Sequence, residues 1–182
     1  MELIEIEGIK YFRHANGGGL VAETAYVAET AYVGPFASVR DRAKVLNEAR
    51  VEDRAVVKDK AVVREKARIR GVAEVYGSAR VCGLAEVYDS ARVYGSAKVS
   101  GRAQIYGSAR VYGKARVFKL AKVYDSARII EKARVYGQAQ VFGIAQVGGF
   151  ARVYGKAQVG GNAYVNNHAE LVSGYHCQGI YR

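Results

Sequence analysis

The chain is dominated by a six-residue repeat that runs through most of its length without an insertion or a deletion. Alanine occupies all 25 of the repeat positions from Ala25 to Ala169, and Val, Ile or Leu occupies all 26 of those from Val21 to Leu171. Residues 109–114 show the unit clearly, as Ala-Arg-Val-Tyr-Gly-Lys. A repeat this short and this regular predicts a solenoid in which each unit packs on its neighbours.

A period of six does not match the 3.6 residues of a helical turn, whereas residues i and i+2 of a strand point to the same side. We therefore expect the Ala and the aliphatic residue of each unit to point inward. The residue between them and the residue after the aliphatic one should point outward. The last two residues, usually Gly-x and sometimes Asp-Ser or Glu-Lys, are typical of a tight corner. The sequence thus predicts an all-β, single-domain solenoid of short strands.

The tandem pattern Val-x-x-x-Ala-x resembles the hexapeptide repeat of left-handed parallel β-helices. The resemblance spans residues 21–171 and implies triangular coils of three hexapeptides, or 18 residues, and so about eight coils. It says little about function, because acyltransferases, gamma-class carbonic anhydrases and non-enzymatic proteins share the repeat. Residues 1–20 and 172–182 lie outside the repeat, and we expect them to form the N-terminal and C-terminal caps.

Stacking every eighteenth residue sorts the outward side chains into columns on three faces. The first face carries a basic column, consisting of Arg80, Lys98, Arg116, Arg134 and Arg152, beside Phe118, Tyr136 and Tyr154. The second face carries Arg92, Arg110 and Arg128 beside Tyr76, Tyr94, Tyr112 and Ile130. The third face has less positive charge and carries Glu86, Gln104, Lys122, Gln140 and Gln158 beside Tyr88, Tyr106, Tyr124 and Phe142. Corner positions add Arg102, Lys114, Lys132 and Lys156.

Positive charge is concentrated in one part of the chain. Residues 92–158 contain 13 Lys and Arg against two Asp and Glu, which equals the net charge of +11 of the whole chain. Like charges stacked on neighbouring strands destabilise a sheet by a few tenths of a kcal/mol each. One interpretation is a surface that keeps the solenoid soluble and opposes sheet-to-sheet aggregation. The other is a binding surface for an acidic protein or for nucleic acid, with aromatic rings available to stack on bases.

Our functional hypothesis is a non-catalytic binding protein whose first and second faces dock on an acidic macromolecule. The third face is our candidate for self-association, through Tyr88, Tyr106, Tyr124, Phe142, Gln104 and Gln140. The family resemblance implies a homo-oligomer, either a dimer or a trimer. A looser resemblance to small phage and prophage hexapeptide-repeat proteins implies an accessory or counter-defence role. A purely architectural oligomer is an alternative.

Catalytic groups are sparse. The three histidines are His14, His168 and His176, and the first lies at the opposite end of the repeat from the others, so they cannot converge on one metal as in carbonic anhydrases. Acyl transfer is a second alternative, with His168 as general base and Glu170 as the nearby acid. A zinc site from His168, His176 and Cys177 matches no strong motif. We therefore predict no catalytic residues, no metal and no cofactor.

Cysteine usage and the start of the chain bear on its location. Cys82 and Cys177 do not make a disulfide framework. The start, Met-Glu-Leu-Ile-Glu-Ile-Glu, has acids where a signal peptide has bases, and no apolar run is long enough to span a bilayer. We expect a cytoplasmic protein with reduced thiols and no membrane partner.

Overall fold

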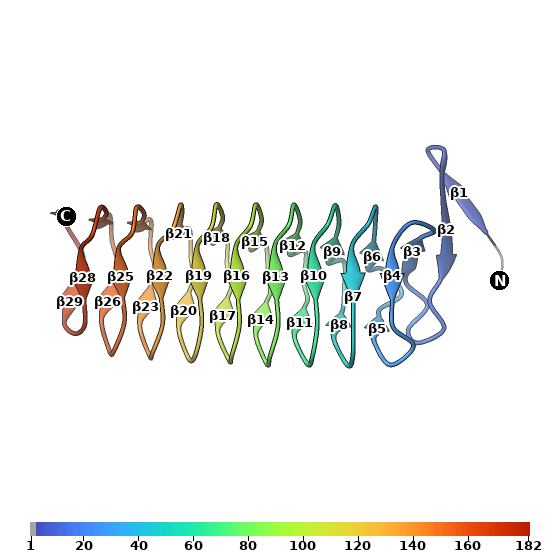
Figure 1. The fold of residues 1–182 in the computed structure, drawn as a ribbon, viewed down its shortest axis with the longest axis horizontal. Helices are drawn as coiled ribbons and strands as arrows, with labels where there is room; N and C mark the ends of the chain where they lie inside the picture. The colour runs from blue at the N-terminus through green and yellow to red at the C-terminus, as the bar shows by residue number, and fades with distance from the viewer. Residues whose placement is uncertain (1–2) are drawn as a thin grey trace.

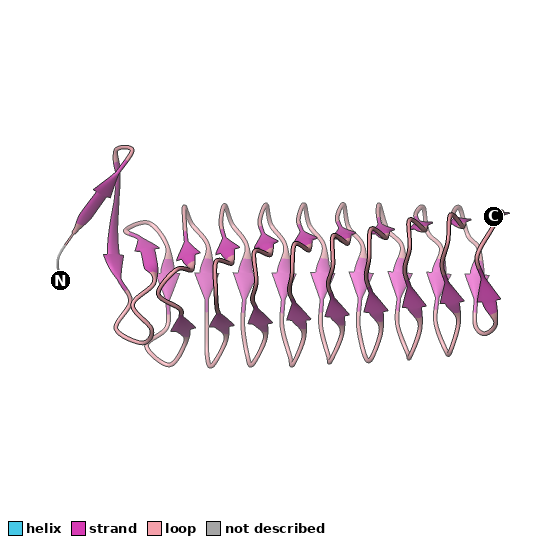
Figure 2. Cartoon of the chain, turned by 180° about the vertical axis from the view of Figure 1, so that it is seen from behind, coloured by secondary structure: helices cyan, strands magenta, loops and turns pink. Residues whose placement is uncertain are grey.

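The computed structural model describes residues 3–182 and winds them into a straight solenoid with the two ends of the chain at opposite ends of the long axis (Figure 1). These residues form 30 strands and no helix, and the view from behind shows the same stacked coils (Figure 2). Within residues 3–182 nothing forms a helix long and apolar enough to span a membrane.

The strands form three sheets that run along the solenoid. Sheet A contains, in order, β1 (Ile4–Ile6), β2 (Ile9–Arg13), β3 (Leu20–Ala22), β6 (Ser38–Val39), β9 (Val56–Val57), β12 (Glu74–Val75), β15 (Arg92–Val93), β18 (Arg110–Val111), β21 (Arg128–Ile129), β24 (Gln146–Val147), β27 (Tyr164–Val165) and β30 (Ile180–Tyr181). Sheet B contains β4 (Tyr26–Val27), β7 (Lys44–Val45), β10 (Val62–Val63), β13 (Arg80–Val81), β16 (Lys98–Val99), β19 (Arg116–Val117), β22 (Arg134–Val135), β25 (Arg152–Val153) and β28 (Glu170–Leu171). Sheet C contains β5 (Tyr32–Val33), β8 (Arg50–Val51), β11 (Arg68–Ile69), β14 (Glu86–Val87), β17 (Gln104–Ile105), β20 (Lys122–Val123), β23 (Gln140–Val141), β26 (Gln158–Val159) and β29 (Tyr175–His176).

The pairing register confirms the predicted coil of 18 residues. Val45 pairs with Val63 and Val63 with Val81, in parallel, and the same step recurs through all three sheets up to β28. The three sheets correspond to the three predicted faces, with the first face on sheet B, the second on sheet A and the third on sheet C. The predicted all-β solenoid fold is therefore confirmed.

The core is a single file of small apolar side chains. Every repeat Ala from Ala31 to Ala169 is buried, as is every repeat aliphatic residue from Val33 to Val165. Each Val or Ile is fully buried beneath the three sheets, and no wider core exists among the described residues for a helix to cover. Burial of these side chains and the backbone ladders between coils together stabilise the fold.

The two ends depart from the repeat. At the N-terminal end, β1, β2 and β3 pair in antiparallel fashion, with Ile4 opposite Tyr11 and Phe12 opposite Val21. At the other end, β29 and β30 continue the parallel sheets, but their partners lie 17 and 16 residues earlier in the chain. Because this tail continues the winding, sheets B and C hold nine strands each, and the solenoid has about nine coils where the sequence predicts about eight.

Candidate functional site

The basic column predicted from the sequence is a physical column on sheet B. β13, β16, β19, β22 and β25 each supply one cation at the position before the buried valine, and the register stacks Arg80 on Lys98, Lys98 on Arg116, and Arg116 on Arg134 and then Arg152. All five side chains are exposed. Since the valine that follows each cation is fully buried, the strand fixes every cation on the outer surface.

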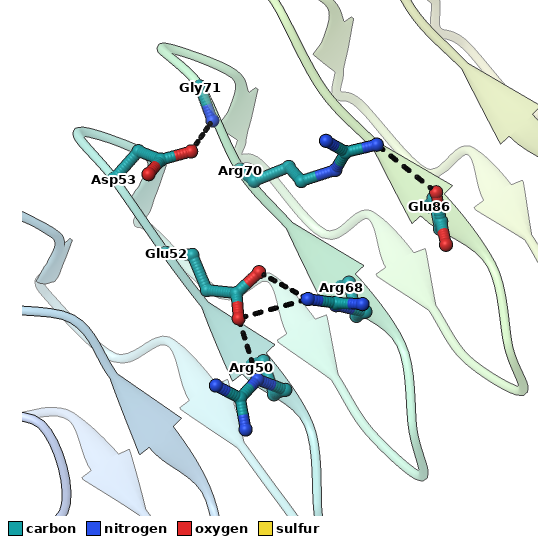
Figure 3. Close-up of polar contacts among 7 residues, drawn as sticks. All are labelled: Arg50, Glu52, Asp53, Arg68, Arg70, Gly71 and Glu86. Carbon is teal, nitrogen blue, oxygen red and sulfur yellow. Dashed lines mark hydrogen bonds and ion pairs between the residues drawn. The ribbon is translucent and has the colours of Figure 1, made fainter.

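Cations in the N-terminal half of the solenoid have carboxylate partners. On sheet C, Glu52 accepts hydrogen bonds from Arg50 at 2.6 Å and from Arg68, one coil further on, at 3.1 Å (Figure 3). Arg70 pairs in the same way with Glu86 at 3.5 Å (Figure 3). Seven of the eight ion pairs formed within residues 3–182 lie between residues 48 and 92. This half of the surface neutralises itself.

The basic column has one carboxylate partner, and it lies at the C-terminal end. Glu170 binds Arg152 at 2.9 Å. Arg80, Lys98, Arg116 and Arg134 form no ion pair within residues 3–182. Four exposed cations therefore stack one coil apart without counter-charges, an arrangement that costs stability unless another molecule supplies anions.

A groove runs beside the C-terminal half of the basic column, between the column and the neighbouring corner. Its volume is about 320 Å³, and its lining consists of Lys114, Arg116, Lys132, Arg134, Phe150, Arg152, His168 and Glu170. The Phe150 ring lies between two cationic or polar neighbours: the Lys132 ammonium is 4.6 Å from the ring centre, and the His168 ring stacks on it at 5.1 Å. The corner lysines thus add a second row of positive charge parallel to the first.

The aromatic columns form ladders of stacked rings on all three sheets. Neighbouring ring centres are 4.7–5.2 Å apart and their planes are within 8° of parallel, in the series Tyr76–Tyr94–Tyr112, Tyr88–Tyr106–Tyr124–Phe142 and Phe118–Tyr136–Tyr154. Stacking covers the faces of the inner rings and leaves their edges and hydroxyls at the surface. Partial burial raises the pKa of Tyr94 above its usual 10.0, and the adjacent tyrosines add to the shift.

The other predicted binding residues are placed as the register requires. Arg92, Arg110 and Arg128 are exposed on sheet A, where Arg92 pairs with Glu74 at 3.6 Å. Gln104 and Gln140 lie on sheet C with the tyrosines that the sequence assigns to self-association. Tyr124 donates a hydrogen bond to Gln140 at 3.3 Å. These residues share a face, but the predicted self-association remains a prediction.

The catalytic alternative depends on His168, which is exposed at the end of the groove. Its ring stacks on Phe150, and the nearby Glu170 carboxylate is bound by Arg152 and by the Tyr154 hydroxyl. A general base needs a group that orients its ring, and Glu170 does not contact His168 within the described residues. No group of three His, Cys, Asp or Glu side chains among residues 3–182 is arranged to hold a metal ion.

Fold and register together define the chain as a β-solenoid repeat protein. Residues 103–118 match the family model described as "YdcK Beta solenoid repeat", a match shorter than one coil. The same hexapeptides continue on both sides of these residues with an unchanged register. Comparison of the chain with curated proteins and with solved structures found no match.

Two features of the site are not apparent from the columns alone. The ion pairs join residues 16 positions apart, such as Arg70 and Glu86, because a long side chain reaches diagonally to the next coil. The groove arises where a corner column and a strand column run side by side. The spacing of Glu52, Glu74 and Glu86 to later arginines is a signal in the sequence for the first feature, but side-chain direction decides which pairs form.

Proposed function

We propose that this protein is a non-catalytic docking protein whose basic column on sheet B binds an acidic protein. The observation that carries the proposal is the contrast along the solenoid. Cations of the N-terminal half have carboxylates of the same chain as partners, whereas Arg80, Lys98, Arg116 and Arg134 have none among the described residues. Guanidinium groups bind carboxylates in planar, two-point geometry, which suits them to acidic side chains.

Ring stacking supports an acidic protein over nucleic acid as the partner. Single-stranded nucleic acids bind basic grooves largely by stacking bases on exposed aromatic faces. On sheet B, Phe118, Tyr136 and Tyr154 stack on one another at 4.8 and 4.9 Å, so the faces between them are covered. The charges remain available, but the platforms for bases are largely closed.

Charge reversal within the column tests the proposal. The double variant Arg116→Glu and Arg134→Glu removes two cations and adds two carboxylates at the centre of the column. We expect fluorescein-labelled poly-L-glutamate to bind the wild type at low salt, with affinity that falls as salt rises, and to bind the variant at least tenfold more weakly. Fluorescence anisotropy measures both affinities.

The matched control is the double variant Arg54→Glu and Lys60→Glu, which changes net charge by the same amount at exposed corners away from the column. Its affinity should stay near that of the wild type. Equal losses in both double variants would mean that net charge, and not the column, attracts the probe. The acyl-transfer alternative and the phage-type accessory role stay predictions, and loss of poly-L-glutamate binding in His168→Ala would favour neither.

A further inference from the structure

Glu170 shows how this face holds a carboxylate. Its Oε1 accepts a hydrogen bond from Arg152 Nη1 at 2.9 Å, and its Oε2 accepts one from the Tyr154 hydroxyl at 3.3 Å. Arg152 and Tyr154 flank the buried Val153 on one strand, and Glu170 lies one coil further on. A guanidinium and a phenol two residues apart therefore bind the two oxygens of one carboxylate.

The phenol contact is a property of the coil and not of one position. On sheet C, the Tyr124 hydroxyl donates to Gln140 Oε1, also at 3.3 Å and also to a residue 16 positions later. Both contacts reach from the position after a buried valine to the outward position of the next coil. Wherever a tyrosine occupies this position, its hydroxyl is directed to an acceptor on the next coil, if the chain supplies one.

Arg134 and Tyr136 repeat these donors one coil before Arg152, but there the chain supplies no acceptor. The residue 16 positions after Tyr136 is Arg152, which can only donate and is bound to Glu170. Within residues 3–182 the Tyr136 hydroxyl forms no hydrogen bond with a side chain, and Arg134 forms no ion pair. The Lys119 ammonium lies 5.8 Å from the centre of the Tyr136 ring and adds a further positive charge.

We infer that Arg134 and Tyr136 form a binding site for the carboxylate of a Glu or Asp side chain, and that Glu170 occupies the equivalent site formed by Arg152 and Tyr154. This inference rests on the proposed function, since the carboxylate comes from the acidic protein that docks on sheet B. The preceding coil offers Arg116 beside Phe118, so it has the cation without the phenol. It should bind a carboxylate less tightly.

Single hydroxyl changes test the site with poly-L-glutamate as the probe. Tyr136→Phe removes one oxygen and keeps the ring that stacks between Phe118 and Tyr154. Its affinity should fall about threefold, as expected for the loss of one exposed hydrogen bond to a charged group. Phe118→Tyr adds a hydroxyl beside Arg116 and should raise the affinity by a similar factor. Tyr106→Phe, beside the neutral Gln104 on sheet C, is the matched control and should leave the affinity unchanged.

A double-mutant cycle at the last coil tests the role given to Glu170. Tyr154→Phe alone should not alter the affinity for poly-L-glutamate, because the Tyr154 hydroxyl is already bound to Glu170. Glu170→Gln frees Arg152 and should increase the affinity. In the Glu170→Gln background, Tyr154→Phe should then lower the affinity about threefold. An effect of Tyr154→Phe that is the same in both backgrounds would overturn this role.

The outcomes separate this inference from the proposed function. If Tyr136→Phe and Phe118→Tyr bind like the wild type while the double charge reversal loses binding, the carboxylate site is wrong and the docking column stands. If the wild type does not bind poly-L-glutamate at low salt, the proposed function fails. If a single-stranded oligonucleotide of equal charge binds more tightly than poly-L-glutamate at the same salt, sheet B is a nucleic-acid surface, and both proposals are overturned.

Discussion

Corner residues illustrate how single positions maintain the winding. Asp89, Gly107 and Asp125 occupy successive coils of one corner, with positive φ angles of 57°, 65° and 56°. The Asp89 carboxylate accepts the backbone N–H of Gly107 at 3.1 Å, and that of Asp125 accepts the N–H of Gly143 at 3.0 Å. Alternation of Asp and Gly satisfies these N–H groups without placing two carboxylates one coil apart.

At this scale we predict that Asp89→Ala destabilises the protein by about 1–2 kcal/mol. The change removes the hydrogen bond to Gly107 and places an alanine in the left-handed region, where its Cβ is strained. Asp89→Gly loses the same hydrogen bond without that strain and should destabilise the protein less. Urea unfolding followed by circular dichroism measures both. A glycine variant as unstable as the alanine variant would show that the backbone conformation contributes nothing.

The stacked tyrosines are the main side-chain contacts between neighbouring strands on the outer surface. On sheet C, Tyr88, Tyr106 and Tyr124 stack at 4.9 Å with planes within 3° of parallel. Burial in the stack raises the pKa of Tyr106 and of Tyr124 above 10.0, and the tyrosine one coil earlier adds to each shift. Each ring therefore contributes contacts that favour the neutral phenol.

The raised pKa values predict a loss of stability in alkali. A phenol with a higher pKa in the folded protein than in the unfolded chain leaves stability unchanged below the unfolded pKa near 10, and stability falls as the pH rises through the folded pKa. The melting temperature should drop between pH 8 and pH 11. The triple variant Tyr88→Phe, Tyr106→Phe and Tyr124→Phe keeps the stack and removes the phenols, so its drop should be smaller. Equal drops would assign the effect to other groups, such as lysines.

The whole molecule divides into a self-paired half and an open half. Along sheet C, the N-terminal coils carry the Glu52 and Glu86 ion pairs, while the later coils present Gln104, Lys122 and Gln140. A face low in charge and rich in tyrosine is typical of protein contacts. Our hypothesis of self-association through sheet C therefore belongs to this scale.

We predict that the protein is a dimer or a trimer of its 19.8 kDa chain. The double variant Gln104→Lys and Gln140→Lys places charge in the candidate contact and should lower the mass measured by light scattering after size-exclusion chromatography. Gln146→Lys together with Gln138→Lys adds the same charge at a strand of sheet A and at a corner, and should leave the mass unchanged. A monomeric wild type would contradict the hypothesis.

Much of this architecture could be predicted from the sequence, because the period determines it. Spacing alone places Ala109 and Val111 in the core and puts Arg116 over Lys98. It could not predict the antiparallel pairing of Ile4 with Tyr11, which lies outside the repeat. Nor could it predict that Tyr175 would pair with Gln158, since the tail lacks the alanine spacing and shortens the coil to 17 residues.

The candidate site was predictable as columns but not as contacts. Column positions of Arg134 and Arg152 follow from the 18-residue coil, and the structure confirms that they are adjacent. Which cations are neutralised depends on the direction of long side chains, as in the binding of Glu170 by Arg152 and Tyr154. A list of outward residues contains no information on that direction.

The uniform rise from coil to coil has a consequence for a ligand on sheet B. Lys98, Arg116 and Arg134 are related by translation, so an acidic chain can shift by one coil and meet nearly the same potential. Such a ligand has several equivalent registers, and this multiplicity favours the bound state entropically and lets the ligand slide without dissociating. The negative charge of Glu170 blocks further movement toward the C-terminal end, so the sliding track is bounded there.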